Sequence, residues 1–233
     1  MCTSFVTRSA DMLVARNFEN NGKPWELQTK SPGQFMVLVS TGRGKYPSFG
    51  INRDGTFINN LCVDSNGKGQ YKRAGKTVTH TSKLTSDILT GVIGPDEIGY
   101  YLSGMEVVNT PDASVHNMIA DRSGNIWIVE PGRGILHSNA KETPYELMTN
   151  FSLCDMERQG GPYGDGANRY QRVKAMLDSN PKPYVTEAFE MLKSVMQSGE
   201  DWTTEFSMVY SPAAHTVYYC MFGQFRNILS YSF

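Results

Sequence analysis

The chain has 233 residues, of which 39% are hydrophobic and 11% aromatic, and it carries 22 Lys and Arg against 23 Asp and Glu. This length and composition suffice to bury a sizeable core, which excludes a disordered protein and predicts one globular domain over residues 1–233. The net charge is −1 and the basic residues are scattered, so nucleic acid is not expected as a partner.

Signals for membrane insertion or export are not found in the sequence. A representative apolar run, residues 35–39, falls far short of the roughly 20 residues that a membrane helix needs, and no basic segment leads into an apolar one at the N-terminus. We therefore expect a cytoplasmic protein that makes no membrane contact.

The cysteines and histidines show no spacing typical of metal ligands or redox motifs. Free cysteine is among the most buried residue types, so three of the four cysteines are expected to be small core residues. These three are Cys62, Cys154 and Cys220. The histidines are interpreted as structural; they are His80, His116, His137 and His215. Neither a metal nor an organic cofactor is expected.

The first quarter of the chain favours antiparallel strands, because short runs of β-branched and aromatic residues alternate with turn residues such as Asn52-Arg53-Asp54-Gly55. The following segment, 64–76, is polar and rich in Gly and Lys, which predicts a loop that is mobile over a site. The expected strands are 2–7, 12–18, 25–29, 35–40 and 56–63.

The rest of the chain alternates between helical and strand patterns. Leu84, Ile88 and Leu89 at helical spacing predict a helix over 82–90, and Pro95 marks the start of a second one. Further helices are expected over 167–177 and 185–196, after a Gly-rich loop. The expected strands are 114–120, 125–130, 146–150, 204–210, 216–222 and 228–231. This order predicts an α+β fold with two antiparallel sheets covered by helices.

Position 2 carries the first candidate for chemistry. The initiator Met1 is normally removed before a small residue such as cysteine, which would leave Cys2 with a thiol and a free α-amine. The unperturbed pKa of an α-amine is about 7.7 to 8.0 and that of a thiol about 8.5, so the amine can take the thiol proton. The resulting thiolate is a strong nucleophile. A cysteine at this position is uninformative without further motifs.

Four further motifs follow in order, and together with Met-Cys-Thr-Ser-Phe they resemble the choloylglycine hydrolase family over nearly the whole chain. The family includes conjugated bile acid hydrolases and penicillin V acylases. The resemblance implies an N-terminal-nucleophile αββα four-layer sandwich that hydrolyses linear amide C–N bonds without a cofactor. The motifs are Val14-Ala15-Arg16-Asn17-Phe18-Glu19, the glycine-turned strand 50–63, Met148-Thr149-Asn150 and Asn168-Arg169-Tyr170-Gln171-Arg172.

The resemblance also implies residue roles. Cys2 corresponds to the nucleophile, Arg16 lies beside it at the substrate carbonyl or the thiol, Asn150 donates to the oxyanion, and Arg169 completes the polar site. The family aspartate that holds the α-amine is replaced by the longer Glu19.

A second family asparagine follows the glycine turn of the strand. Ungapped matching from Gly55 places Cys62 there, and Asn60 or Asn59 reaches it only after a shift. Asn60 is therefore taken as the candidate for this second asparagine.

The chain departs from the family in its length. The interval between Asn150 and Arg169 is too short for the long hairpin that clasps a neighbouring subunit in the tetrameric hydrolases, so a monomer or homodimer is expected. Bile salts and penicillin V are not assigned to this chain as substrates, and the expected partner is a small N-acyl amide. The short chain is also similar to the acyltransferase and carcinine hydrolase branch, although no internal Gly-Cys processing site is found.

Two alternatives stay open at this point. Class II glutamine amidotransferases also begin with Met-Cys, but they continue with Gly-Ile and carry an Arg-Gly substrate motif that is not found here. A non-enzymatic interaction protein on the same fold is favoured if Met1 stays attached and blocks the α-amine.

Overall fold

The structure, a computed structural model, describes residues 2–8, 11–29 and 33–233. The chain divides into two compact units. The terminal unit contains the residues up to Lys23 together with Ser138–Phe233, and the central unit contains Pro24–His137. The expectation of one domain over the whole chain stays a prediction.

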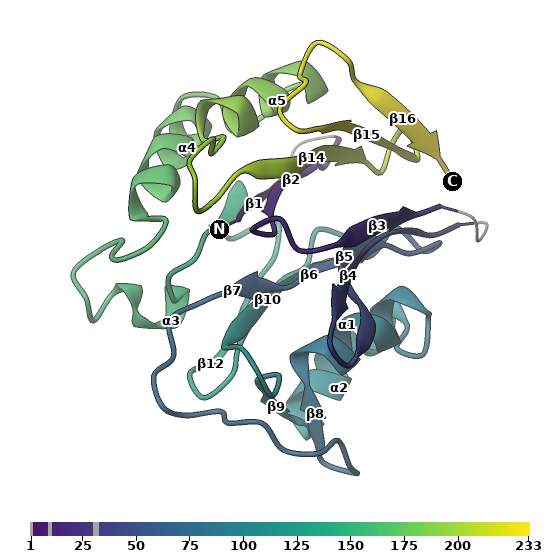
Figure 1. Ribbon diagram of the computed structural model, residues 1–233, viewed down its shortest axis with the longest axis vertical. Coiled ribbons are helices and arrows are strands. Elements are labelled where there is room, and N and C mark those ends of the chain that lie inside the picture. Colours follow the sequence, from purple (N-terminus) through teal and green to yellow (C-terminus); the bar gives the residue numbers. More distant parts are fainter. Residues whose placement is uncertain (1, 9–10, 30–32) are drawn as a thin grey trace. The chain divides into compact units, whose positions relative to one another are not determined.

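An antiparallel sheet forms the terminal unit, with the strand order β13-β1-β2-β14-β15-β16 (Figure 1). Because β1 pairs with β13 on one side and β2 on the other, the first strand of the chain lies inside this sheet. The strands are β1 (Thr3–Thr7), β2 (Val14–Glu19), β13 (Tyr145–Met148), β14 (Thr204–Ser211), β15 (Thr216–Met221) and β16 (Leu229–Ser232).

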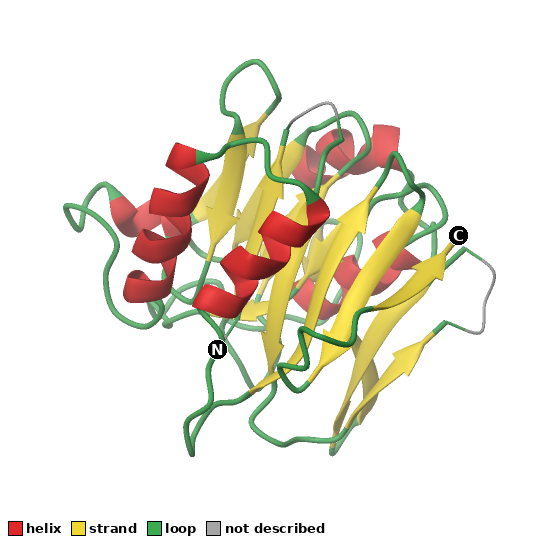
Figure 2. Ribbon diagram, turned by 90° about the horizontal axis from the view of Figure 1, so that it is seen from above, coloured by secondary structure: helices red, strands yellow, loops and turns green. Residues whose placement is uncertain are grey.

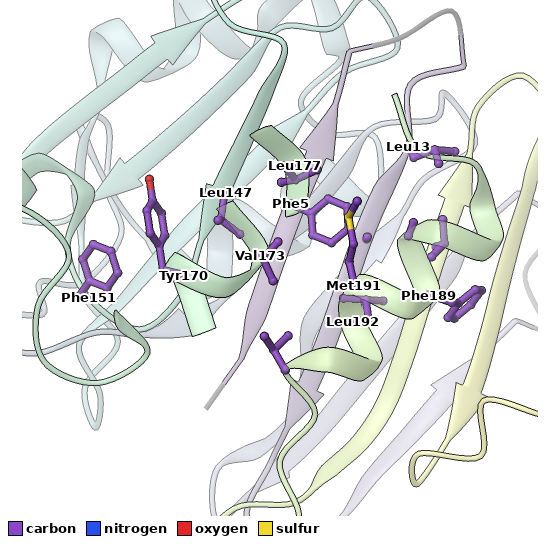
Figure 3. Close-up of a cluster of buried hydrophobic side chains, with 14 residues drawn as sticks. Phe5, Leu13, Leu147, Phe151, Tyr170, Val173, Leu177, Phe189, Met191 and Leu192 are labelled. Atoms are coloured by element: carbon purple, nitrogen blue, oxygen red, sulfur yellow. The ribbon is translucent and has the colours of Figure 1, made fainter. Parts of the chain in front are cut away.

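Helices α4 (Ala167–Ser179) and α5 (Val185–Ser194) cover one face of this sheet (Figures 1 and 2). Figure 3 shows the apolar cluster between the sheet and these two helices, in which Phe5 of β1 lies among side chains of both helices. Side chains alternate along a strand, so Ser4 and its register partner Arg16 point to the opposite face of the sheet.

The central unit contains a second antiparallel sheet, with the strand order β12-β11-β10-β6-β5-β4-β3, and β7 pairs with β10 beside it. Its strands are β3 (Trp25–Gln28), β4 (Phe35–Thr41), β5 (Gly44–Ile51), β6 (Phe57–Asn59), β7 (Leu61–Cys62), β10 (Val115–Ala120), β11 (Ile126–Glu130) and β12 (Gly134–Ser138).

Helices α1 (Thr81–Leu89) and α2 (Ile98–Gly104) pack on this second sheet, as Leu84 and Ile98 meet Ile58 and Ile119 in one apolar cluster. The remaining elements are the parallel pair β8 (Val78–His80) and β9 (Glu106–Val108), the 3₁₀ turn η1 (Pro95–Glu97) and the short helix α3 (Leu153–Met156). Within the described ranges, no helix is long and apolar enough to cross a membrane.

The predicted elements differ from the structure mainly in the central unit. The prediction of one continuous strand over 56–63 is wrong, because β6 ends before Asn60 and β7 begins after it. The N–H of Asn60 donates to the carbonyl of Ser48. Strand β5 was not predicted over its full length because it contains Pro47, which lies beside an irregularity in the pairing with β4. The exposed edge strand β12 and the short helix α3 were also not predicted.

The segment 64–76, predicted as mobile, is held at several points. Arg133 donates to the carbonyl of Asp64 at 2.6 Å, and Asn66 donates to that of Gly132 at 3.2 Å. A Cβ on Gly69 would lie 2.6 Å from the backbone nitrogen of Gly132, so only glycine permits this approach.

The prediction of three core cysteines is wrong for Cys62, which is exposed on the two-residue strand β7. Cys154 is half-buried and only Cys220 is fully buried. The interpretation of the histidines as structural residues agrees with the position of His116, which is buried with its Nδ1 3.0 Å from Oε1 of Glu130.

Candidate active site

Cys2 directly precedes β1 and is buried, with 6% of its surface exposed. Its Sγ lies 3.5 Å from Nη2 of Arg16 and 3.8 Å from the carbonyl oxygen of Glu19. Burial raises the pKa of the Cys2 thiol, while the positive charge of Arg16 lowers it. The guanidinium therefore favours the thiolate inside an environment that otherwise disfavours it.

Arg16 is a fully buried cation on β2. Its Nη1 donates to Oγ of Ser4 at 3.0 Å, and its guanidinium carbon lies 5.8 Å from the centre of the Phe18 ring. The β1–β2 register sets the first contact, since Ser4 and Arg16 are paired directly across the two strands. These contacts hold the planar guanidinium with Nη2 at the sulfur.

Arg169, in the first turn of α4, connects the helix to the start of β1. Its Nη1 donates to the carbonyl oxygen of Cys2 at 2.7 Å and to Oγ1 of Thr3 at 2.9 Å. Its Nη2 donates to Oδ1 of Asn150 at 2.9 Å. Because the amide oxygen of Asn150 is taken by Arg169, its Nδ2 donor end is turned away from the guanidinium.

A glycine makes room for this guanidinium. Gly166, the residue before α4, has a φ of 87°, and a Cβ there would lie 2.9 Å from Nη2 of Arg169 and 2.9 Å from Oγ1 of Thr149. Thr149 in turn donates to the carbonyl of Gly166 at 3.2 Å. The close approach of this loop to the strand end requires glycine.

Glu19 ends β2 and is buried, with 4% of its surface exposed. Its Oε1 accepts a hydrogen bond of 2.6 Å from Oγ1 of Thr204, whereas Oε2 has no hydrogen-bond partner among the described residues. Burial raises the pKa of Glu19, and the hydrogen bond from Thr204 and the charges of Arg169 and Arg16 lower it.

The structure thus brings five of the six predicted residues together within the terminal unit; they are Cys2, Arg16, Glu19, Asn150 and Arg169. Sequence reasoning did not identify Ser4, Thr204 or Gly166. Thr204 and Gly166 lie outside the quoted motifs, and Ser4 lies inside the first one, but its contact with Arg16 depends on the β1–β2 register. Met1 lies outside the described residues, so its removal stays a prediction.

Asn60, the sixth residue, lies in the central unit. Its Nδ2 donates to the carbonyl of Pro47 at 3.2 Å and to Oγ1 of Thr85 at 3.0 Å, and its Oδ1 accepts from Asn117 at 2.8 Å. Its backbone N–H donates to the carbonyl of Ser48 at 2.7 Å. Its role as an oxyanion donor stays a prediction.

In the part of the chain that the structure describes, no group of three or more His, Cys, Asp or Glu side chains has the geometry to hold a metal ion.

No family model and no curated protein matches the sequence. Solved structures do match. The chain is similar to the conjugated bile acid hydrolase from Clostridium perfringens, solved as its C2A mutant, with a TM-score of 0.72 and 15% identity over 100% of this chain and 92% of that one. It is also similar to penicillin V acylase from Agrobacterium tumefaciens, with a TM-score of 0.68 and 16% identity over 94% of this chain and 83% of that one.

A third solved structure is the Caenorhabditis elegans ortholog of N-acylethanolamine-hydrolyzing acid amidase, with a TM-score of 0.50 and 12% identity over 100% of both chains. At these identities the likeness shows the fold. The predicted fold, with two antiparallel sheets covered by helices, is therefore confirmed.

Proposed function

We propose that the chain is a cysteine N-terminal-nucleophile amidohydrolase, which cleaves a linear amide C–N bond in a small N-acylated molecule. The observation that carries the proposal is the contact of the buried Cys2 thiol with the buried guanidinium of Arg16 at the beginning of an internal strand. The names of the matched structures support it, since they are a bile acid hydrolase, a penicillin V acylase and an acid amidase.

In the first half of the reaction, the α-amine of Cys2 takes the thiol proton and Sγ attacks the amide carbonyl carbon. Arg16 favours the thiolate, and Nδ2 of Asn150 donates to the oxyanion that forms. The tetrahedral intermediate collapses, the C–N bond breaks and the leaving amine takes its proton from the α-ammonium group. An acyl-thioester remains on Cys2.

In the second half, the α-amine takes a proton from water, whose oxygen attacks the thioester carbonyl. The C–S bond breaks, the acid product leaves and the sulfur regains its proton from the α-ammonium group. Glu19 holds that ammonium group, and the buried Oε2 atom without a partner in the described structure supports this assignment. A buried carboxylate is stabilised by a cationic partner.

The proposal extends to the setting of the enzyme. The substrate class is a small N-acyl amide, and neither bile acids nor penicillin V are assigned to this chain. The protein works in the cytoplasm as a monomer or homodimer, without a metal or an organic cofactor.

The test is intact-mass spectrometry of the purified protein before and after exposure to a panel of N-acyl amides. The expected result is a chain without Met1 that gains the acyl mass on Cys2 and releases the amine. Cys2→Ala abolishes both effects, whereas Cys62→Ala, which removes an exposed thiol, leaves them intact. Turnover by folded Cys2→Ala would refute the nucleophile, and retained Met1 on an inactive protein would favour an interaction protein.

A further inference from the structure

The carboxylate of Glu19 is held from one side. Thr204, the first residue of β14, places its Oγ1 2.6 Å from Oε1, and both residues are buried. The β2–β14 pairing explains the approach, since Thr204 and Glu19 are register partners and the register then shifts between Thr204 and Phe206. An irregularity of this kind re-aims a side chain at a strand end.

The direction of the Thr204 hydroxyl is fixed by a second residue. The backbone N–H of Gln197 donates to Oγ1 of Thr204 at 2.9 Å, and the N–H of Thr204 donates to the carbonyl of Gln197 at 2.9 Å. A hydroxyl has one proton to donate. Since Oγ1 accepts from Gln197, its proton goes to Oε1 of Glu19.

This arrangement leaves the two carboxylate oxygens unequal. Oε1 is taken by Thr204, and Oε2 is buried with no hydrogen-bond partner in the described part of the chain. The charges that act on Glu19 from its surroundings include Arg169 and Arg16, whose guanidinium groups are directed at Asn150 and Cys2 instead. A charge-assisted hydrogen bond to one oxygen favours the ionised form of the whole carboxylate.

We propose that Thr204 is a positioning residue that orients Glu19 and keeps it ionised, so that Oε2 receives the α-ammonium group of Cys2. The inference rests on the proposed function, because it needs Cys2 to be the N-terminal residue. Gln197 supports the contact through its backbone N–H and carbonyl groups.

The test compares Thr204→Val, which keeps the shape and removes the hydroxyl, with Thr204→Ser, which keeps the hydroxyl. Thr216→Val is the matched control, because Thr216 is a buried threonine of the same sheet whose hydroxyl donates to the carbonyl of Ala214. Thr204→Ala replaces Thr204→Val if the latter does not fold, since it adds no bulk.

The first readout is the pH profile of kcat/KM. Removal of the hydroxyl weakens the ionised form of Glu19, so the acid limb moves to higher pH by about one unit, and activity on that limb falls roughly tenfold. Thr204→Ser and Thr216→Val keep the wild-type profile. A Thr204 variant that loses thermal stability but keeps the wild-type acid limb overturns the proposal.

The second readout does not need turnover. The rate at which acetic anhydride modifies the N-terminal amine is followed against pH by mass spectrometry of the N-terminal peptide. Loss of the oriented carboxylate lowers the midpoint of this profile in Thr204→Val and not in Thr204→Ser. A shifted amine profile in an enzyme that cleaves no amide refutes the proposed function and supports the contact; an unshifted profile in an active enzyme refutes the contact.

Discussion

Replacement of Arg169 by methionine tests whether this residue stabilises the fold by linking helix α4 to the start of strand β1. Arg169 is 6% exposed in the wild type, and its guanidinium donates to the carbonyl of Cys2, to Thr3 and to Asn150. Hydrogen bonds to charged groups contribute roughly 1.5–3 kcal/mol each, and the desolvation of a buried guanidinium offsets much of their sum. Since methionine leaves buried acceptors unpaired, we expect the free energy of unfolding to fall by about 3 kcal/mol.

The assay is equilibrium unfolding in urea, followed by circular dichroism and tryptophan fluorescence. Arg172→Met is the matched control, because Arg172 is exposed on the same helix and donates to the carbonyl of Ser194 at 3.1 Å. Its loss should change the free energy of unfolding by less than about 1 kcal/mol. If Arg169→Met and Arg172→Met agree within that range, Arg169 does not connect α4 to the start of the chain.

Three further predictions concern the same site. Gly166→Ala should destabilise the protein by about 2 kcal/mol more than Gly160→Ala in urea unfolding, since both glycines have positive φ but a Cβ has open space only at position 160. In Arg16→Gln, alkylation of Cys2 by iodoacetamide should reach half its maximal rate at a higher pH than in the wild type, because the charge of Arg16 lowers the thiol pKa. Relative to Glu19→Gln, the wild type should lose stability between pH 4 and pH 7, since burial raises the pKa of Glu19 in the folded state and its ionisation opposes folding as pH rises.

Each has an outcome that contradicts it. Equal losses of stability in Gly166→Ala and Gly160→Ala would show that the loop does not approach Thr149 closely at Gly166. An alkylation profile unchanged by Arg16→Gln would separate the guanidinium from the thiol. A stability gain of Glu19→Gln that is the same at pH 4 and pH 7 would come from packing and not from charge.

The sequence predicted the fold where local pattern and tertiary pairing agree. Strands β10 and β11 contain β-branched and other apolar residues on either side of a Gly-containing turn, and this local pattern alone places them. Strand β5 contains Pro47 and two glycines, which lower strand propensity, and it is a strand because β4 and β6 pair with it on both sides. Tertiary pairing overrides propensity there.

The candidate site shows the same division. Cys2, Arg16 and Arg169 stand in motifs, and their order along the chain predicted them. Thr204 lies 185 positions from Glu19, and its role depends on a register and an irregularity that the sequence does not reveal. The polarity of a residue can be read from the sequence, but not the atom that it will face.

The internal position of β1 has a consequence for the time at which Cys2 reaches its final surroundings. Arg169 reaches the carbonyl of Cys2 across 167 positions, and β2 pairs with β14, which begins at Thr204. Such distant pairings form slowly, and during synthesis they wait until the last part of the chain has emerged. Cys2 is therefore among the last residues to acquire its final neighbours, because Arg169 follows it by 167 positions.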